Sequence, residues 1–251
     1  EISCSLVGSE MCIRDSDGVV VFYTFSNGKM YFSGLEDKYP VKYQKQGSYV
    51  GGLFVFESKL TQEFRLHFDE KIAEMFQSIG IREGSVWIEV FHDGENYYFN
   101  EVGFRYGGSV SIYPVDYFYQ INQVAADIHY ALTGESCISE HTSLIRSTLP
   151  RKKYYCIYPV HINAGTISSI SGLDKIAQLE NIVYLATTKY LHDRIESSGS
   201  FSQVFALVHF VCNTTEECIQ TIDRIHQMLV VFDEHGNNMV NRMLDVGKII
   251  F

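Results

Sequence analysis

The segment from Gly84 to Gly108 constrains the fold most strongly, because it predicts a β-hairpin that carries two acidic residues on one face. Residues 86–91 and 97–102 are rich in Val, Ile, Tyr, Phe and Trp, and the residues between them are turn-forming types. A solvent-exposed hairpin whose acids have no partner is the ordinary alternative for such a pattern.

The turn determines the register of this hairpin. We expect a three-residue loop over residues 94–96, because Gly, Glu and Asn stand there between the two β-forming runs. A slip of one residue would turn the two acids to opposite faces. The loop sets three residue pairs opposite each other: Asp93 and Tyr97, Phe91 and Phe99, and Glu89 and Glu101.

The predicted pair of carboxylates indicates a site for a cation and phosphate. Glu89 and Glu101 would repel each other unless a cation lies between them, and Mg²⁺ takes carboxylate oxygens together with phosphate oxygens. Arg105 follows closely and offers a planar donor fork suited to phosphate or acyl-phosphate oxygens. The joint occurrence of two acids, an arginine and a Gly-rich turn favours a ligand site over a plain surface hairpin.

These residues resemble the C-terminal part of an ATP-grasp enzyme, of the branch that includes biotin carboxylase and the large subunit of carbamoyl-phosphate synthase. The resemblance covers nearly all of residues 17–251. It implies that Glu89 and Glu101 hold Mg²⁺, for which Mn²⁺ could substitute, and bind ATP through it. It also implies that Arg105 contacts the phosphorylated intermediate. Gly103 stands where the family most often has a metal-binding Asn, so we expect water or a neighbouring side chain to complete the coordination.

The resemblance implies an ATP- and Mg-dependent ligase that joins a small-molecule carboxylate to an amine through an acyl-phosphate. Residues 106–110 lack the hydrophobic-Glu-His segment of the carboxylase branch, which disfavours biotin-dependent carboxylation. A carbamoyl-phosphate synthase-like activity and a non-catalytic nucleotide-binding or scaffold module stay open as alternatives. In the family a basic loop near residues 36–52 reaches the phosphates or the acyl substrate. Lys38 and Lys45 are therefore candidate ATP ligands, with ordinary surface lysines as the alternative.

The N-terminal residues call for separate treatment. Residues 6–16 resemble a translated frame of a transposase adaptor used to build DNA sequencing libraries. We therefore expect residues 1–16 to be a sequencing-adaptor artefact or a disordered scar, with a short natural segment as the alternative. The family's upstream lysines and Gly-rich loop would precede Asp17. We accordingly expect a fragment whose activity needs a missing N-terminal part.

Hydrophobic patterning predicts an α+β fold. It indicates the C-terminal half of an ATP-grasp fold, an antiparallel sheet with packed helices, over residues 17–140, followed by a small α/β subdomain over 150–251. The first part holds strands at 18–25 and 29–35, a helix at 61–79 whose apolar face includes Met75 and Ile79, and a helix at 117–132. The second part holds strands near 154–162, 165–170, 181–187 and 203–212, then a helix that begins at Thr214 and buries Cys218, Ile222, Ile225 and Leu229.

Composition narrows the function classes. The net charge is −10, and removing residues 1–16 takes away three acids and one base, which leaves −8; an acidic chain of this kind is a poor candidate for nucleic-acid binding. No apolar run approaches the roughly 20 residues that span a bilayer. The cysteines lack C-x-x-C spacing and the histidines lack H-x-x-x-H spacing, which favours a reducing cytoplasm and gives no zinc motif. A homodimer stays open.

Overall fold

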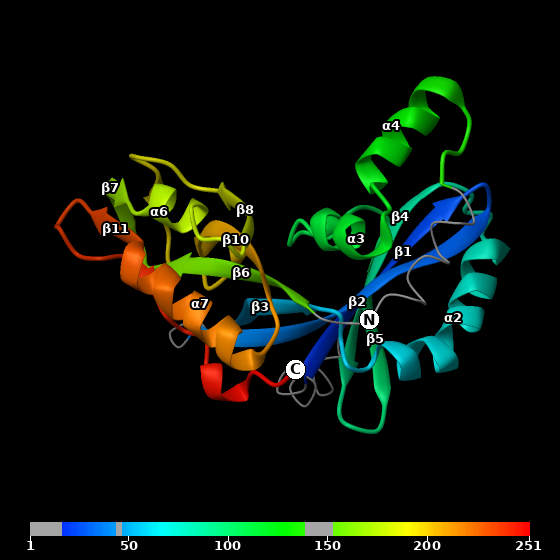
Figure 1. Cartoon of the computed structure of the whole chain (residues 1–251), viewed down its shortest axis with the longest axis horizontal. Helices are drawn as coiled ribbons and strands as arrows, with labels where there is room; N and C mark the ends of the chain where they lie inside the picture. The colour runs from blue at the N-terminus through cyan, green and yellow to red at the C-terminus, as the bar shows by residue number, and fades with distance from the viewer. Residues whose placement is uncertain (1–16, 44–46, 139–152) are drawn as a thin grey trace, which may run out of the picture. The chain divides into compact units, whose positions relative to one another are not determined.

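The computed structural model describes residues 17–43, 47–138 and 153–251. The expected adaptor scar and Lys45 lie outside these described residues. The described chain divides into two compact units (Figure 1). The first unit contains residues 17–37 and 56–138, and the second contains residues 38–55 and 153–251.

The first unit is built on four strands in the order β5-β4-β1-β2, with β4 antiparallel to both of its neighbours. The strands predicted at 18–25 and 29–35 are confirmed as β1 and β2, and Asn27 and Gly28 form the turn between them at positive φ. The elements of this unit are β1 (Asp17–Ser26), β2 (Lys29–Lys42), which continues into the second unit, β4 (Gly84–His92), β5 (Tyr97–Gly103), α2 (Thr61–Ser78), α3 (Ile112–Tyr119) and α4 (Gln123–Thr133).

Helix α2 packs on this sheet through apolar side chains spaced four or eight residues apart. Phe64, Ile72 and Phe76 are buried, and the ring of Phe76 lies 5.3 Å from that of Phe25 in β1. The prediction that Met75 and Ile79 are also buried is wrong, because Met75 is 46% and Ile79 is 68% exposed. A stripe at i, i+4 spacing is narrower than the predicted face, so residues beside it stay in solvent.

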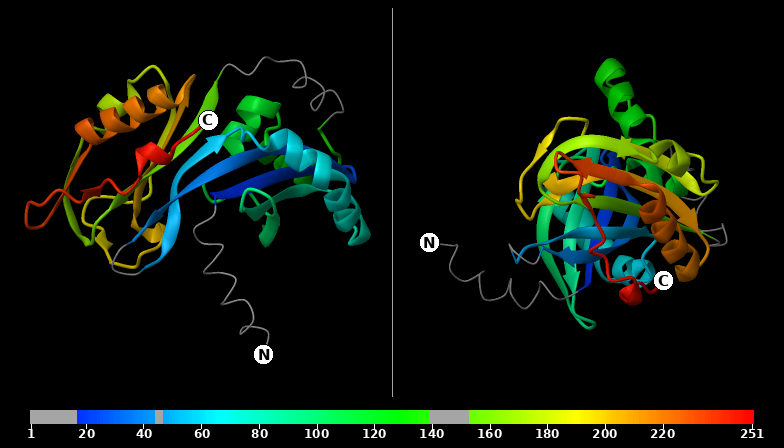
Figure 2. Two further views of the ribbon diagram at one scale, coloured as in Figure 1. Left: turned by 90° about the horizontal axis from the view of Figure 1, so that it is seen from below. Right: turned by 90° about the vertical axis from the view of Figure 1, so that its left-hand side faces the viewer.

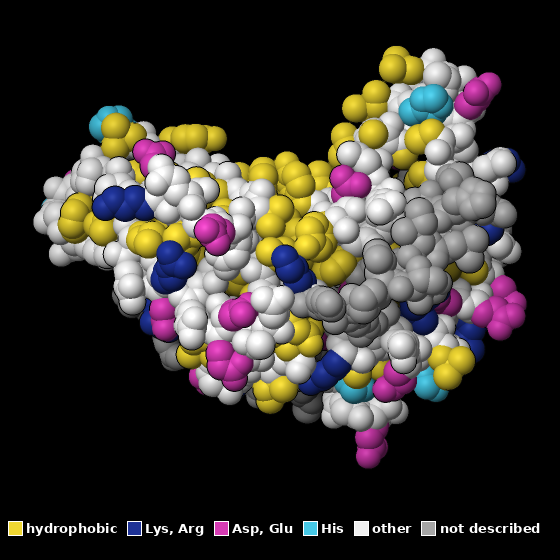
Figure 3. Space-filling model, in the orientation of Figure 1, with side chains coloured by type: hydrophobic (Ala, Val, Ile, Leu, Met, Phe, Trp, Pro, Cys, Tyr) yellow, Lys and Arg dark blue, Asp and Glu magenta, His cyan; other side chains and the backbone are white. Residues whose placement is uncertain are grey.

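The single helix predicted over residues 117–132 is wrong, because two helices are found. Gln120 adopts a left-handed conformation at the end of α3, and the side chain of Asn122 accepts a hydrogen bond from the Ala125 N–H at 2.9 Å to cap α4. An Asn at this point favours a new helix start over continuation. Hydrophobic side chains stay exposed over α4 as a result, including Leu132, which is 82% exposed (Figure 3).

The second unit is also largely antiparallel, and the strands predicted there are confirmed. The main strand order is β3-β6-β10-β8, beside which the last residues of β2 lie, and a small sheet has the order β11-β7-β9. Its elements are β3 (Tyr49–Phe56), β6 (Tyr154–Ile162), β7 (Gly165–Ser171), α6 (Leu173–Ala177), β8 (Ile182–Thr187), β9 (Arg194–Ile195), β10 (Val204–Cys212), α7 (Thr215–Met228), β11 (Val230–Asp233), β12 (Val240–Asn241) and two short 3-10 turns, Phe201–Gln203 and Val246–Lys248.

Helix α7 covers one face of the β6–β10 pair, as the views of Figure 2 show. Its N-cap is Thr214, as predicted, whose hydroxyl accepts a hydrogen bond from the Glu217 N–H at 3.2 Å. The four predicted core positions of this helix, Cys218, Ile222, Ile225 and Leu229, are all fully buried. Among the described residues, no helix is both long enough and apolar enough to cross a membrane.

Candidate metal and phosphate site

The predicted pairing of the two acids is confirmed, because Glu89 in β4 lies directly opposite Glu101 in β5. Side chains in this relation share one face, with Cβ atoms about 5 Å apart. The path to this register differs from the prediction. Tyr97 pairs with His92 and Tyr98 pairs with Phe91, so the two other predicted pairs, of Asp93 with Tyr97 and of Phe91 with Phe99, are wrong.

Two local irregularities compensate each other. The loop contains four residues, 93–96, where three were predicted, and a bulge between Glu89 and Val90 leaves Asn100 without a strand partner. The longer loop shifts the register by one residue, and the bulge shifts it back. The two glutamates therefore share a face despite the wrong turn.

Asp93 explains the longer loop. Its Oδ1 atom accepts hydrogen bonds from the backbone N–H groups of Glu95 at 2.9 Å and Asn96 at 2.7 Å, and its Oδ2 atom accepts one from the Tyr98 hydroxyl at 2.8 Å. These bonds, the one from Asn96 above all, lower the pKa of the Asp93 carboxyl. Asp93 therefore belongs to the turn and closes it, in place of pairing as a strand residue.

The bulge residue contributes to the candidate site. The Asn100 amide nitrogen donates a hydrogen bond to Oε2 of Glu89 at 2.8 Å, which fixes one oxygen of that carboxylate. Sequence reasoning missed this residue, because a bulge depends on turn length and cannot be recognised from strand alternation. The one sequence feature that could have indicated Asn100 is an amide side chain next to Glu101, in a strand otherwise rich in aromatic residues.

Trp87 explains why residue 103 is a glycine. These two residues are paired across the strands, and a Cβ atom at position 103 would overlap the indole ring. The indole Nε1 atom is buried and has no hydrogen-bond partner in the described chain. The ring therefore occupies the space that the side chain of a metal-binding Asn would need.

Arg105 extends the same end of the hairpin. Its guanidinium carbon lies 5.1 Å from the centroid of the Trp87 ring, and its Nη1 atom donates a hydrogen bond to the carbonyl oxygen of Tyr106 at 2.8 Å. A cation held over an indole face is positioned by the ring quadrupole while its remaining donors stay available. Glu89, Glu101 and Arg105 thus gather around one Trp-Gly pair in the first unit.

The other predicted residues lie elsewhere in the chain. Lys38 belongs to the part of β2 that is assigned to the second unit. Gly107 has a packing explanation, because a side chain there would overlap Ser111 and Phe22, whereas a Cβ atom at Gly108 would meet no atom within 4 Å. Gly107 is thus required for packing, whereas Gly108 leaves open space beside the backbone.

Comparison with known proteins addresses the fold. No protein-family model and no curated protein matches the sequence. The structure resembles L-amino acid ligase from Bacillus licheniformis, with a TM-score of 0.68 and 20% identity, over 88% of this chain and 52% of that chain. It resembles phosphoribosylglycinamide synthetase from Anaerococcus prevotii, with a TM-score of 0.69 and 12% identity, over 88% of this chain and 54% of that chain.

A third similar structure is the biotin carboxylase domain of the 2-oxoglutarate carboxylase of Hydrogenobacter thermophilus, which was solved with MgADP and bicarbonate. The TM-score is 0.64 at 13% identity, over 86% of this chain and 46% of that chain. All three are ATP-grasp enzymes, and this chain spans about half of the length of each. The chain therefore has the α+β fold of the ATP-grasp enzymes.

Proposed function

We propose that this chain is the C-terminal part of an ATP- and Mg-dependent ligase that joins a carboxylate to an amine through an acyl-phosphate. The observation that carries the proposal is the direct opposition of Glu89 and Glu101 on one face of the β4–β5 hairpin, with Arg105 stacked on Trp87 beside them. In this proposal, residues 17–140 belong to the ATP-grasp domain and residues 150–251 form a small α/β subdomain.

The donor set suits a hard divalent cation bound together with phosphate. Glu89 and Glu101 supply anionic oxygens, and the amide of Asn100 holds Glu89 in place at 2.8 Å. The guanidinium of Arg105, which lies over the Trp87 ring, supplies hydrogen-bond donors that complement anionic oxygens. Because Gly103 offers no side chain, water or phosphate oxygens would complete the coordination, as Mg²⁺ commonly requires.

Each residue of the site would have a separate task. When bound, Mg²⁺ neutralises phosphate charge while the γ-phosphoryl group passes from ATP to the carboxylate substrate. Glu89 and Glu101 hold the cation, and Asn100 keeps the Glu89 carboxylate oriented. Arg105 presents two parallel donors to the oxygens of the acyl-phosphate, a task that a lysine performs less well. An amine then attacks the acyl carbon, and phosphate leaves.

Further parts of the proposal rest on the family resemblance. Lys38 and Lys45 would bind ATP phosphates, Mn²⁺ could replace Mg²⁺, and the protein would act on small molecules in the cytoplasm. Activity would need a preceding nucleotide-binding portion, which agrees with the half-length match to the similar structures. A homodimer is compatible with this arrangement.

The test is substrate-dependent ADP release by the longer enzyme that carries this chain. We expect Glu101→Gln to lower the rate on the order of a hundredfold or more, because it removes an anionic metal ligand but keeps the side-chain shape. Glu95→Gln in the turn of the same hairpin is the matched control and should keep the rate. Near-normal turnover of Glu101→Gln would contradict the assignment.

A second candidate function is a non-catalytic nucleotide-binding or scaffold module. The Trp87 ring fills the space that a side chain at position 103 would need. One expected metal ligand is therefore missing, which favours this second candidate. Such a module would bind Mg-ATP or no nucleotide, and no carboxylate would increase ATP turnover. Biotin carboxylase-like or carbamoyl-phosphate synthase-like activity would instead show dependence on bicarbonate, and for the former also on biotin.

A further inference from the structure

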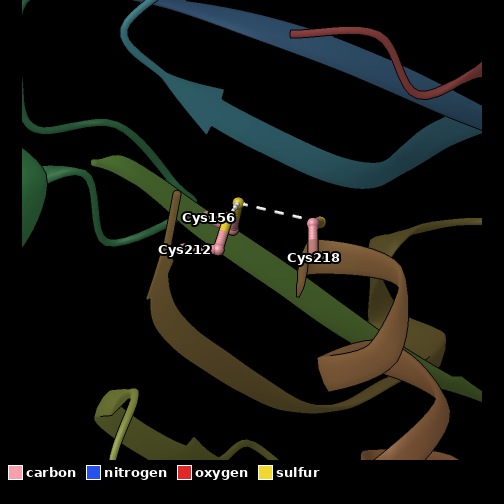
Figure 4. Close-up of side chains that lie close together, drawn as sticks. All are labelled: Cys156, Cys212 and Cys218. Atoms are coloured by element: carbon pink, nitrogen blue, oxygen red, sulfur yellow. Dashed lines mark hydrogen bonds between the residues drawn. The ribbon is translucent and has the colours of Figure 1, made fainter. Parts of the chain in front are cut away.

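Three cysteines meet inside the second unit, and none of them is part of the site proposed above. Cys156 lies on β6, Cys212 ends β10 and Cys218 lies near the start of α7 (Figure 4). The Cys156 sulfur is 3.7 Å from that of Cys212 and 3.8 Å from that of Cys218, and all three sulfurs lie within 4.8 Å of one another. All three side chains are buried, and none forms a disulfide.

Three separate elements produce this convergence. Cys156 pairs with Phe210 across the β6–β10 ladder, so Cys212 lies two residues further along the same face of β10. The Thr214 cap starts α7 directly after this strand, and Cys218 then points from the buried stripe of the helix towards the sheet. Sequence spacing gave no sign of the cluster, because Cys156 is far from the other two along the chain and Cys212 and Cys218 do not form a C-x-x-C motif.

The spacing of the sulfurs suits a thiolate-bound metal. An ion about 2.3 Å from each sulfur would hold the sulfurs roughly 3.8 Å apart in a tetrahedral arrangement and about 4.0 Å apart in a trigonal one. The separations of the Cys156 sulfur from the other two, 3.7 and 3.8 Å, are close to these values. Buried cysteines usually pack as small apolar side chains, but such packing does not require three of the four described thiols to meet at one point.

The chemistry of the cluster selects the class of ion. In the described chain, no histidine nitrogen or carboxylate oxygen joins the three sulfurs in the cluster, and burial keeps water out as a fourth ligand. Structural Zn²⁺ is almost always four-coordinate, whereas soft thiolates select Cu(I). We propose that Cys156, Cys212 and Cys218 form a three-thiolate site for a soft monovalent metal ion, Cu(I).

Charge balance has a measurable consequence. Full coordination of Cu⁺ by three thiols releases three protons and leaves a complex with a net charge of −2, without any change in oxidation state. The positive end of the α7 dipole lies beside Cys218 and lowers the cost of this charge. Because protons are released, Cu(I) affinity should rise with pH.

The experiment is a competition for Cu(I) under anaerobic, reducing conditions, with bicinchoninate as the competing chelator. The full chain is used with Cys4, Cys12 and Cys137 replaced by serine, so that only the three clustered thiols remain. We expect one equivalent of Cu(I) to move from the chelator to the protein. Cys212→Ala in this background should weaken binding at least tenfold, and the conservative core change Ile222→Val should not. Undiminished binding in Cys212→Ala would overturn the proposal, as would no transfer to the background protein.

A second measurement does not use an alanine variant, so it tests the proposal even if Cys212→Ala fails to fold. X-ray absorption at the copper edge of the loaded, unsubstituted cluster should give three sulfur neighbours at about 2.2 to 2.3 Å. Coordination dominated by nitrogen or oxygen would overturn the proposal. Because no residue of β4 or β5 takes part, neither result depends on the ligase proposal.

Discussion

The β4–β5 hairpin of the first unit and the β6–β10 pair of the second are both antiparallel ladders, yet they differ in what surrounds them. Residues 155–162 of β6 are all buried, whereas residues 98–102 of β5 are all exposed. In the buried pair, packing limits which residues can stand at each position. In the exposed hairpin, hydrogen bonding and charge set those limits, and a cation or a phosphate can reach the side chains. Four predictions about stability follow from this contrast.

The largest difference should come from truncating one aromatic side chain in each ladder. Phe210→Ala in β10 should lower the free energy of unfolding by about 3–5 kcal/mol, because the ring is fully buried and leaves a cavity. Phe99→Ala in β5 should cost less, because this ring is 46% exposed. Chemical denaturation followed by far-UV circular dichroism measures both variants. Equal losses of unfolding free energy in the two variants would contradict the contrast between the buried and the exposed ladder.

A smaller effect is expected when the family's Asn is restored at position 103. Gly103→Asn should lower stability by about 1–3 kcal/mol and displace the Trp87 ring, because the new Cβ atom overlaps it. Trp87 is the single tryptophan of the chain, so its fluorescence emission reports this displacement without interference. Gly108→Asn is the matched control, since no atom lies within 4 Å of a Cβ atom there. Unchanged emission in Gly103→Asn would show that the ring does not close this position.

Lowering the pH should destabilise the second unit through protonation of His161. Its Nδ1 atom lies 2.9 Å from the Tyr43 hydroxyl and its Nε2 atom 2.9 Å from the Gly51 carbonyl oxygen, and burial lowers its pKa. The folded state therefore binds protons less readily than the unfolded state, whose histidine pKa is about 6.5. This contribution to stability is fully present above that pH and decreases as the pH falls below it.

The measurement is the midpoint of thermal unfolding between pH 7 and pH 5. We expect it to fall towards pH 5 in the unsubstituted chain and to fall less in His161→Gln. The exposed His129 serves as the control position, since His129→Gln should keep the original pH dependence. The same slope in His161→Gln would exclude His161 as the cause.

The smallest effect on stability should come from the acids of the hairpin. Glu89→Gln should change the free energy of unfolding by less than about 0.5 kcal/mol, because the residue is only partly buried and opposes another acid. Denaturation curves of the two proteins should overlap within that margin. A loss as large as that of Phe210→Ala would mean that Glu89 has a structural role.

Periodic patterns allowed much of the fold to be predicted, because alternation and helical stripes report burial of a whole element. The buried stripe of α7 is an example, whereas Glu89 and Glu101 lie opposite each other only because the bulge offsets the longer turn. The four-residue turn and the bulge at Asn100 could not be predicted, since they depend on which backbone groups the Asp93 side chain binds. The Trp87–Gly103 contact and the cysteine cluster depend on tertiary packing, which local spacing does not encode.

Binding of Mn²⁺ together with ADP to the longer enzyme that the proposed function requires, followed by electron paramagnetic resonance, tests whether the exposed hairpin holds a metal. The unsubstituted enzyme and the turn control Glu95→Gln should bind Mn²⁺ in a nucleotide-dependent manner, whereas Glu89→Gln and Glu101→Gln should each weaken it at least about tenfold while remaining folded. Equal Mn²⁺ affinity in all four proteins would contradict the assignment of the two glutamates as the metal ligands.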